Sequence, residues 1–275
     1  MYKKIALAIA FSPTVEALLC EAKRIQRLHQ ALLILIHIGT ETDEQKEWLD
    51  HLLNKHQINK HEVKVIWEKG KPSKKIVQIC NKEEVDLLVA GALKKELLIN
   101  YYLGSIARKL IRKAKCSVLI FVAPSTFPKS FKKVVVNGTQ HPQTPFVIKH
   151  AVQFCKFEMP RQLFILSEIK MYALQMATVG QGSEDEVYQF RKKLVNEEIL
   201  YVKNILKETD AGNLKINIKV NTERWTTQLT EFSKNVHADL LVVGGQEKLN
   251  FFDRMFPHDL EDLLTNLPCN ILIVK

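Results

Sequence analysis

VDLLVAGA, the stretch Val85–Ala92, occurs again 153 residues later as ADLLVVGG at Ala238–Gly245. The same offset carries CSVLI at Cys116–Ile120 onto CNILI at Cys269–Ile273. In each copy an apolar run ends at a glycine turn, and a helical segment and a second apolar run follow. Two matches at one spacing indicate a duplicated domain.

Apolar runs and amphipathic segments alternate along the first copy. Continuous apolar runs predict strands of a parallel sheet that is covered on both faces. We expect strands at 3–10, 31–38, 62–67, 86–90 and 117–122, and helices at 12–28, 43–56, 73–81 and 105–114. In the first helix, Ser12 is the expected N-cap and Pro13 the first helical residue. The alternation predicts right-handed crossovers and an α/β fold with doubly wound, Rossmann-like sheets.

A proline-containing joint at 123–128 divides the chain, because proline resists continuing a helix or a strand. We predict two tandem domains at 1–124 and 130–275, each with a five-stranded parallel sheet, related by a pseudo-twofold axis. The second domain contains a long connection at 167–185, which is either functional or disordered, and then a helix from about 184 to 208. The last strands, 118–122 and 271–274, are expected to pair, since an apolar edge strand must be covered.

Composition is that of a globular protein, with 46% hydrophobic and 25% charged residues. No apolar run approaches the roughly 18–20 residues that span a bilayer, so we expect no membrane segment. Five widely spaced cysteines without a C-x-x-C pair predict reduced thiols in a cytoplasmic protein. The nine histidines show no metal-ligand spacing, so we expect no metal site.

Most of the net charge of +10 lies in the first half of the chain, because residues 1–127 hold 21 Lys/Arg against 13 Asp/Glu. A basic first half either attracts phosphates or is simply a solvated, lysine-rich surface. A glycine turn between a buried strand and a helix is where open α/β sheets bind phosphate. Gly91, Gly104 and Ser105 occupy such a turn, with Lys94 between them. The alternative is that these glycines only end a strand and start a helix.

Four segments of the first copy resemble the end of a universal stress protein domain: Gly70–Pro72, Gly91, Leu103–Ser105 and Cys116–Ile120. Nucleotide-binding members of that family carry G-x2-G-x9-G-[ST] before a last helix and strand. The second copy repeats the outline and ends at Pro268–Leu272, so the resemblance covers nearly the whole chain. It implies five-stranded α/β domains, pairing between domains, and often ATP binding in stress physiology.

The first copy departs from the family pattern at two positions. Lys94 stands where the second glycine belongs, and Ala10 stands where nucleotide-binding members usually have an aspartate. The Lys94 side chain either crowds the turn or contacts a phosphate directly. Through the resemblance, Gly91, Lys94, Gly104 and Ser105 are the candidate contacts for ATP.

The second copy departs further. Asn137 keeps a polar residue at the end of its first strand, and Gly244 corresponds to Gly91. Glu247 replaces the second glycine, and 257–258 read Pro-His in place of Gly-Ser. Proline lacks an N–H donor and glutamate repels phosphate. We therefore expect that this copy does not bind ATP in the usual way, and we keep Asn137 and Gly244 as candidate contacts.

Motifs for catalysis are missing from the sequence. It contains no G-x-S-x-G elbow and no P-loop, so we expect a non-enzymatic protein. The basic helix at 105–114 lacks base-reading residues, which argues against nucleic acid. Three functions stay open: an ATP-regulated sensor in stress response, a nucleotide-free adaptor acting through an unknown protein partner, and a binder of another small ligand in a remodelled pocket. A homodimer is compatible with each.

Overall fold

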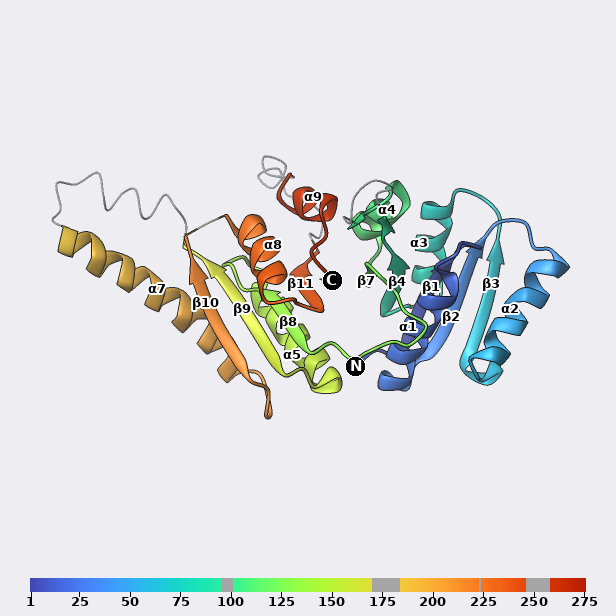
Figure 1. Ribbon diagram of the computed structural model, residues 1–275, viewed down its shortest axis with the longest axis horizontal. Helices are drawn as coiled ribbons and strands as arrows, with labels where there is room; N and C mark the ends of the chain where they lie inside the picture. Colours follow the sequence, from blue (N-terminus) through green and yellow to red (C-terminus); the bar gives the residue numbers. More distant parts are fainter. Residues whose placement is uncertain (95–100, 170–183, 223, 246–257) are drawn as a thin grey trace. The chain divides into compact units, whose positions relative to one another are not determined.

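The apolar runs of the first repeat form a buried parallel sheet in the computed structural model of the protein (Figure 1). The structure describes residues 1–94, 101–169, 184–222, 224–245 and 258–275. The chain divides into two units, of which unit 1 comprises residues 1–130, 245–256 and 264–275 and unit 2 comprises residues 131–244 and 257–263.

Unit 1 contains the strands and helices expected for the first repeat, together with a short 3-10 helix and a two-stranded hairpin that were not expected. They are β1 (Lys4–Ile9), α1 (Val15–His29), β2 (Leu32–Ile38), α2 (Asp43–Lys55), the 3-10 helix η1 (Lys60–Glu62), β3 (Val63–Glu68), α3 (Pro72–Lys82), β4 (Leu87–Gly91), β5 (Leu93–Lys94), β6 (Tyr101–Tyr102), α4 (Ser105–Lys113) and β7 (Ser117–Phe121). The parallel strands lie in the order β7-β4-β1-β2-β3. The predicted five-stranded parallel sheet of this repeat is confirmed.

The strand order determines where a ligand can bind. From β1 the chain moves outward to β2 and β3, and then returns to β4 on the other side of β1. Right-handed crossovers therefore place α1 and α2 on one face and α3 and α4 on the other, as can be followed in Figure 1. The order reverses between β1 and β4, and open α/β sheets bind ligands beyond the carboxyl ends of the strands at such a point.

The start of α1 corrects a prediction. Thr14 is the N-cap and Val15 the first helical residue, so Ser12 and Pro13 precede the helix. The Ser12 N–H donates to the Ala10 carbonyl at 2.7 Å, and the Val15 N–H donates to the Ser12 carbonyl at 3.1 Å. These bonds form tight turns immediately after β1, and the helix can begin only where they end.

The last strand of the second repeat, β12 (Asn270–Val274), lies in unit 1. It pairs antiparallel with β7, with Leu272 opposite Leu119. These are the two strands that the sequence expects to meet. Consequently the sheet of unit 1 has a sixth, antiparallel strand that covers β7.

Unit 2 repeats the parallel part of this plan. Its elements are β8 (Lys133–Asn137), α5 (Thr144–Glu158), β9 (Gln162–Glu168), α7 (Glu184–Lys207), β10 (Ile216–Asn221), α8 (Trp225–Asn235) and β11 (Leu240–Gly244), followed by α9 (His258–Thr265), within which the unit boundary falls. The strand order is β10-β9-β8-β11, all parallel. Of the expected connection at 167–185, residues 167–168 belong to β9, 184–185 to α7, and 170–183 lie outside the described residues.

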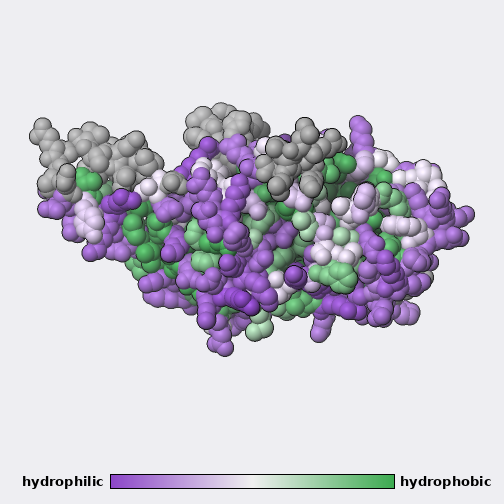
Figure 2. Space-filling view, viewed as in Figure 1, coloured by the Kyte–Doolittle hydropathy of each residue, from purple (hydrophilic) through white to green (hydrophobic). Residues whose placement is uncertain are grey.

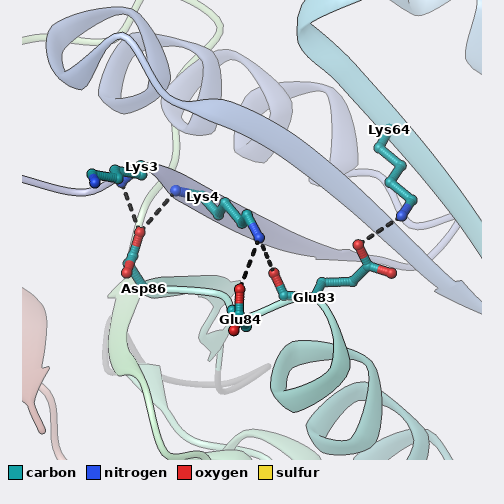
Figure 3. Close-up of polar contacts among 6 residues, drawn as sticks. All are labelled: Lys3, Lys4, Lys64, Glu83, Glu84 and Asp86. Carbon is teal, nitrogen blue, oxygen red and sulfur yellow. Dashed lines mark hydrogen bonds and ion pairs between the residues drawn. The ribbon is translucent and has the colours of Figure 1, made fainter.

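The same hydrogen bonds anchor the first strand of each repeat. In unit 1 the Asp86 carboxylate accepts from the backbone N–H groups of Lys3 and Lys4 at 2.7 and 2.9 Å, and the Lys4 ammonium donates to the Glu83 carbonyl at 2.8 Å (Figure 3). In unit 2, Asp239 accepts from Lys132 and Lys133, each at 2.8 Å. The two aspartates, which the sequence shows opening a buried strand, have this structural role in both units.

Burial follows the apolar pattern. Strands β4, β7, β8 and β11 have fully buried centres, and all five cysteines are buried free thiols. On the face shown in Figure 2, hydrophilic residues surround smaller hydrophobic patches. Among the helices that the structure describes, none is long and apolar enough to cross a bilayer.

Candidate functional site

A cavity of about 400 Å³ opens in unit 1 at the point where the strand order reverses. Its walls come from the ends of β1, β2 and β4, from α1 and α3, and from the first turns of α4. Gly91, Gly104 and Ser105 all line it, so the structure brings together three of the residues that the glycine spacing singles out. Ligand pockets typically measure about 300–1,000 Å³, and this cavity is at the lower end of that range.

One end of the cavity is suited to an anion. Gly104 is the N-cap of α4, its backbone is extended (φ −66°, ψ 165°), and no side chain caps the helix. The N–H groups of the first turn have no partner within a helix, and they lie at the positive end of the helix dipole. Ser105, Ile106 and Ala107, which carry these N–H groups, line the cavity. A phosphate bound here would accept several backbone hydrogen bonds.

Two glycines keep this end open. A Cβ at Gly91 would lie 2.9 Å from the Leu18 Cδ1 atom, and a Cβ at Gly104 would lie 2.8 Å from the Leu93 Cδ1 atom. Both distances are too short for carbon atoms in contact. The side chains of Leu18 and Leu93 therefore pack directly against the glycine backbone and would have to shift to admit a Cβ, and both leucines line the cavity.

The segment between Gly91 and Gly104 contains a small hairpin that the sequence did not predict. Strand β5 pairs antiparallel with β6, with Lys94 opposite Tyr101. This pairing shows where the Lys94 backbone lies, but its side chain and residues 95–100 lie outside the described part of the chain. The two alternatives for the Lys94 side chain, that it crowds the turn or that it contacts a phosphate, both stay predictions.

The C-terminal segment of unit 1 is hydrogen-bonded to β6 and to the residues that follow it. The Leu103 N–H donates to the Leu264 carbonyl, and the Leu267 N–H donates to the Tyr101 carbonyl, both at 3.2 Å. The Arg108 guanidinium also donates to the Thr265 hydroxyl at 3.3 Å. The approach to Gly104 is thus fixed by residues about 160 positions away in the sequence.

The other end of the cavity is formed by the ends of β1 and β2. His37 and Ile38 line it, together with the hydroxyl-bearing Ser12 and Thr14. The His37 Nδ1 atom lies 3.2 Å from the Ile9 carbonyl oxygen, and only a protonated Nδ1 can donate to that oxygen. Sequence reasoning missed His37; the signal was a histidine within the apolar run LLILIHI of β2.

Charged side chains are missing from the described lining. None of the described residues around the cavity is Asp, Glu, Lys or Arg, and Ala10 lines it directly after β1. The backbone of α4 therefore supplies the electrostatic attraction at this site. The remaining described walls are mostly apolar.

The corresponding end of unit 2 is occupied by its own side chains. The Asn137 amide oxygen accepts from the Thr139 N–H at 3.1 Å. Glu198, from α7, accepts from the Ser167 hydroxyl at 2.5 Å and from the Gln140 amide at 2.8 Å. Gly244 ends β11, where a Cβ would lie 3.1 Å from Val147. Asn137 and Gly244 thus end neighbouring strands, and a carboxylate from α7 bonds to the loops beside them.

Two predicted features of unit 2 fall outside the described residues. Glu247 and Pro257 lie within 246–257, for which no structure is described. The expected loss of the phosphate turn there stays a prediction.

Unit 1 is thus a doubly wound α/β domain with a ligand cavity at its switch point and an uncapped helix N-terminus facing that cavity. Residues 1–121 match the model of the universal stress protein family. The first repeat therefore matches the domain of this family.

Known proteins similar to this chain include a universal stress protein of Methanocaldococcus jannaschii, 26% identical over 153 aligned residues that cover 44% of this chain and 94% of the relative. A functionally unknown protein from Pseudomonas aeruginosa PAO1 has a TM-score of 0.75 at 15% identity, covering 100% of this chain and 92% of its own. A universal stress protein from Archaeoglobus fulgidus has a TM-score of 0.65 at 13% identity, covering 99% and 98%. At these identities the two structures show the fold of both repeats.

Proposed function

We propose that this protein is a non-enzymatic component of the stress response in the cytoplasm, and that unit 1 binds one nucleotide. The phosphate binds at the N-terminus of α4, and the rest of the ligand fills the cavity towards β2. The uncapped first turn of α4, which lies against the cavity, carries this proposal. The five buried free thiols support a reducing compartment.

Unit 2 does not bind a second nucleotide in this proposal. Glu198 places a carboxylate against Gln140 and Ser167 at the strand ends where a ligand would bind, and its charge would repel a phosphate. We therefore expect one nucleotide per chain. The antiparallel pairing of β12 with β7 also supports the proposal that the two repeats associate through their last strands.

The sharpest test compares Ser105→Pro with Ser105→Ala. Ser105 is the first helical residue of α4 and follows an extended glycine, so proline fits there without strain. Proline removes both the hydroxyl and the N–H donor, whereas alanine removes the hydroxyl alone. Because a hydrogen bond to a charged group contributes about 1.5–3 kcal/mol, S105P should weaken ATP or AMP binding at least about tenfold further than S105A.

Binding is measured by calorimetry with Mg-ATP, ADP and AMP, and thermal unfolding shows whether both variants fold. Nucleotide carried through purification is extracted by heat and quantified by chromatography. Absence of binding by all three nucleotides at millimolar concentration, with no nucleotide extracted, would sink the proposal.

A further inference from the structure

Four aromatic rings gather at the end of the cavity opposite α4. The His37 ring lies 4.8 Å from the Phe11 ring and 4.8 Å from the Trp67 ring, measured between centroids. Phe11 also lies 5.2 Å from Trp48, edge-on, and 6.0 Å from Trp67, stacked. Residues from the turn after β1 and from β2, α2 and β3 thus form one aromatic cluster, comprising Phe11, His37, Trp48 and Trp67.

His37 is the member of this cluster that lines the cavity. The other rings pack against it or against one another, and the bond between its Nδ1 atom and the Ile9 carbonyl fixes the ring orientation. Gly39 leaves room beside it, since a Cβ there would lie 2.4 Å from the His37 Nε2 atom. The cavity therefore ends at a flat, immobilised ring.

Phe11 and Trp48 are each 37% exposed, although both are large aromatic residues. Tyrosine, tryptophan and phenylalanine normally bury most of their area. The cluster thus presents partly uncovered aromatic surface beside the His37 wall. A planar ring lying against this surface would gain stacking energy that a sugar or a polyphosphate could not.

The middle of the cavity offers little to a sugar. Sites that read ribose hydroxyls commonly use a carboxylate as acceptor, and no carboxylate belongs to the described lining. Ala10 follows β1 there, and the nearby Ser12 and Thr14 hydroxyl oxygens lie 3.3 Å from each other. Either hydroxyl can donate a hydrogen bond to the other.

We propose that the unit 1 site selects its ligand by an aromatic ring and a phosphate, and does not discriminate between ribose and deoxyribose. The ring stacks on the wall that His37 forms and Phe11 flanks, and the phosphate binds at α4. This inference rests on the proposed function, because it assumes that a nucleotide enters the cavity.

The test titrates the full chain with AMP, dAMP, ribose 5-phosphate and inorganic phosphate. Replacing Trp225, on α8 in unit 2, by Phe leaves Trp48 and Trp67 as the remaining tryptophans of the chain, so fluorescence then reports on the aromatic cluster. We expect AMP and dAMP to bind within about twofold of each other and to change this fluorescence. Ribose 5-phosphate should bind at least about fivefold more weakly, because a stacked base contributes about 1–3 kcal/mol.

Variants separate the ring contact from folding. His37→Ala should weaken AMP about tenfold and leave ribose 5-phosphate unchanged, whereas His37→Phe, which keeps a flat ring, should restore most of the AMP affinity. Phe11→Ala should weaken AMP by a smaller factor. Phe127→Ala is the matched control, since Phe127 is 83% exposed and does not line the cavity. Thermal unfolding of each variant shows that it folds.

Three outcomes overturn the inference. A preference for AMP over dAMP above tenfold would show that the sugar is read, and an equal loss of AMP and ribose 5-phosphate in His37→Ala would show that the ring does not stack there. In both cases nucleotide binding, and the proposed function, stand. If AMP, dAMP and ATP all fail to bind, the proposed function fails and the inference with it.

Discussion

Units 1 and 2 share their strand anchors and differ at their strand ends. Asp86 and Asp239 hold the first strand of each unit through the same pair of backbone N–H groups. Left-handed residues also recur, with Glu84 at φ 54° and His237 at φ 52°. At the carboxyl ends, however, unit 1 has a cavity lined by glycine and helix N–H groups, while unit 2 has a carboxylate bonded to its loops.

The difference teaches which positions a duplicated fold must keep. The backbone N–H groups at the start of each first strand have the same kind of acceptor in both copies, so the residue that supplies it is the same on both sides of the duplication. Side chains at the strand ends contribute little to the sheet, and they can change without loss of the fold. Four predictions can break or sharpen this comparison.

The largest effect is expected at β12, the strand of the second repeat that lies in unit 1. Leu272 is fully buried opposite Leu119, so Leu272→Ala should lower the free energy of unfolding by about 3 kcal/mol. Val65→Ala is the control, on the opposite edge strand β3, where the side chain is 36% exposed. With Trp225 replaced by Phe in both variants, urea unfolding followed by Trp48 and Trp67 fluorescence reports on unit 1. A loss in L272A no greater than in V65A would contradict the assignment of β12 to this unit.

Acid should act on unit 2 through His150. Burial lowers the pKa of His150 from 6.5 to about 4, so the folded state keeps this imidazole neutral while the unfolded chain protonates it. Its contribution to stability is complete above pH 6.5 and is lost as the pH falls towards 4, amounting to about 3 kcal/mol. His150→Gln should flatten the dependence of unfolding free energy on pH between 6.5 and 4, as measured by urea unfolding at several pH values. An unchanged slope would show that His150 does not titrate in this way.

The shared anchors should give matched losses. Asp86→Ala and Asp239→Ala each remove a charged acceptor from two N–H groups, so each should cost about 1.5–2 kcal/mol of unfolding free energy. Asparagine at either position retains one oxygen and should cost less. Denaturant unfolding measures all four variants, and a loss confined to one aspartate would mean that the two copies no longer use this anchor equally.

The smallest effect separates the two glycines at the strand ends. Gly91→Val places atoms beside Leu18 at the cavity and should weaken AMP binding about tenfold, near 1.4 kcal/mol. Gly244→Val makes the same change in unit 2 and should leave AMP affinity unaltered. Calorimetry compares them, and equal losses in the two variants would place the nucleotide elsewhere.

The strands were predictable from sequence because both faces of a parallel sheet are buried. A short, continuous apolar run that is followed by a glycine turn and a helix is typical of a buried parallel strand. The runs LLVAG of β4 and LLVVG of β11 have this pattern. Local reasoning failed at the start of α1, where Ser12 and Pro13 have the composition of a helix start but are used in turns after β1. Cap residues and turn residues are the same amino acids, so composition alone does not separate them.

The two ends of the candidate site also differ in how far local sequence predicts them. Gly91, Gly104 and Ser105 lie on one short segment, and their spacing predicted the phosphate end. Phe11 and His37 are 26 positions apart, and they meet only because β1 and β2 are neighbours in register, with Ile9 opposite His37. Contacts between strands leave no local spacing to read, and the apolar run around His37 conceals its role.

The placement of β12 also has a consequence for biosynthesis. Asn270 follows Phe121 by about 150 residues, a stretch that a ribosome translates in roughly 7–30 s at about 5–20 residues per second. Throughout that interval the nascent first domain carries β7 as an uncovered apolar edge, and such edges invite pairing with other chains. We expect truncated or stalled products that end before β12 to aggregate, and a chaperone that shields β7 during translation to raise the yield of folded protein.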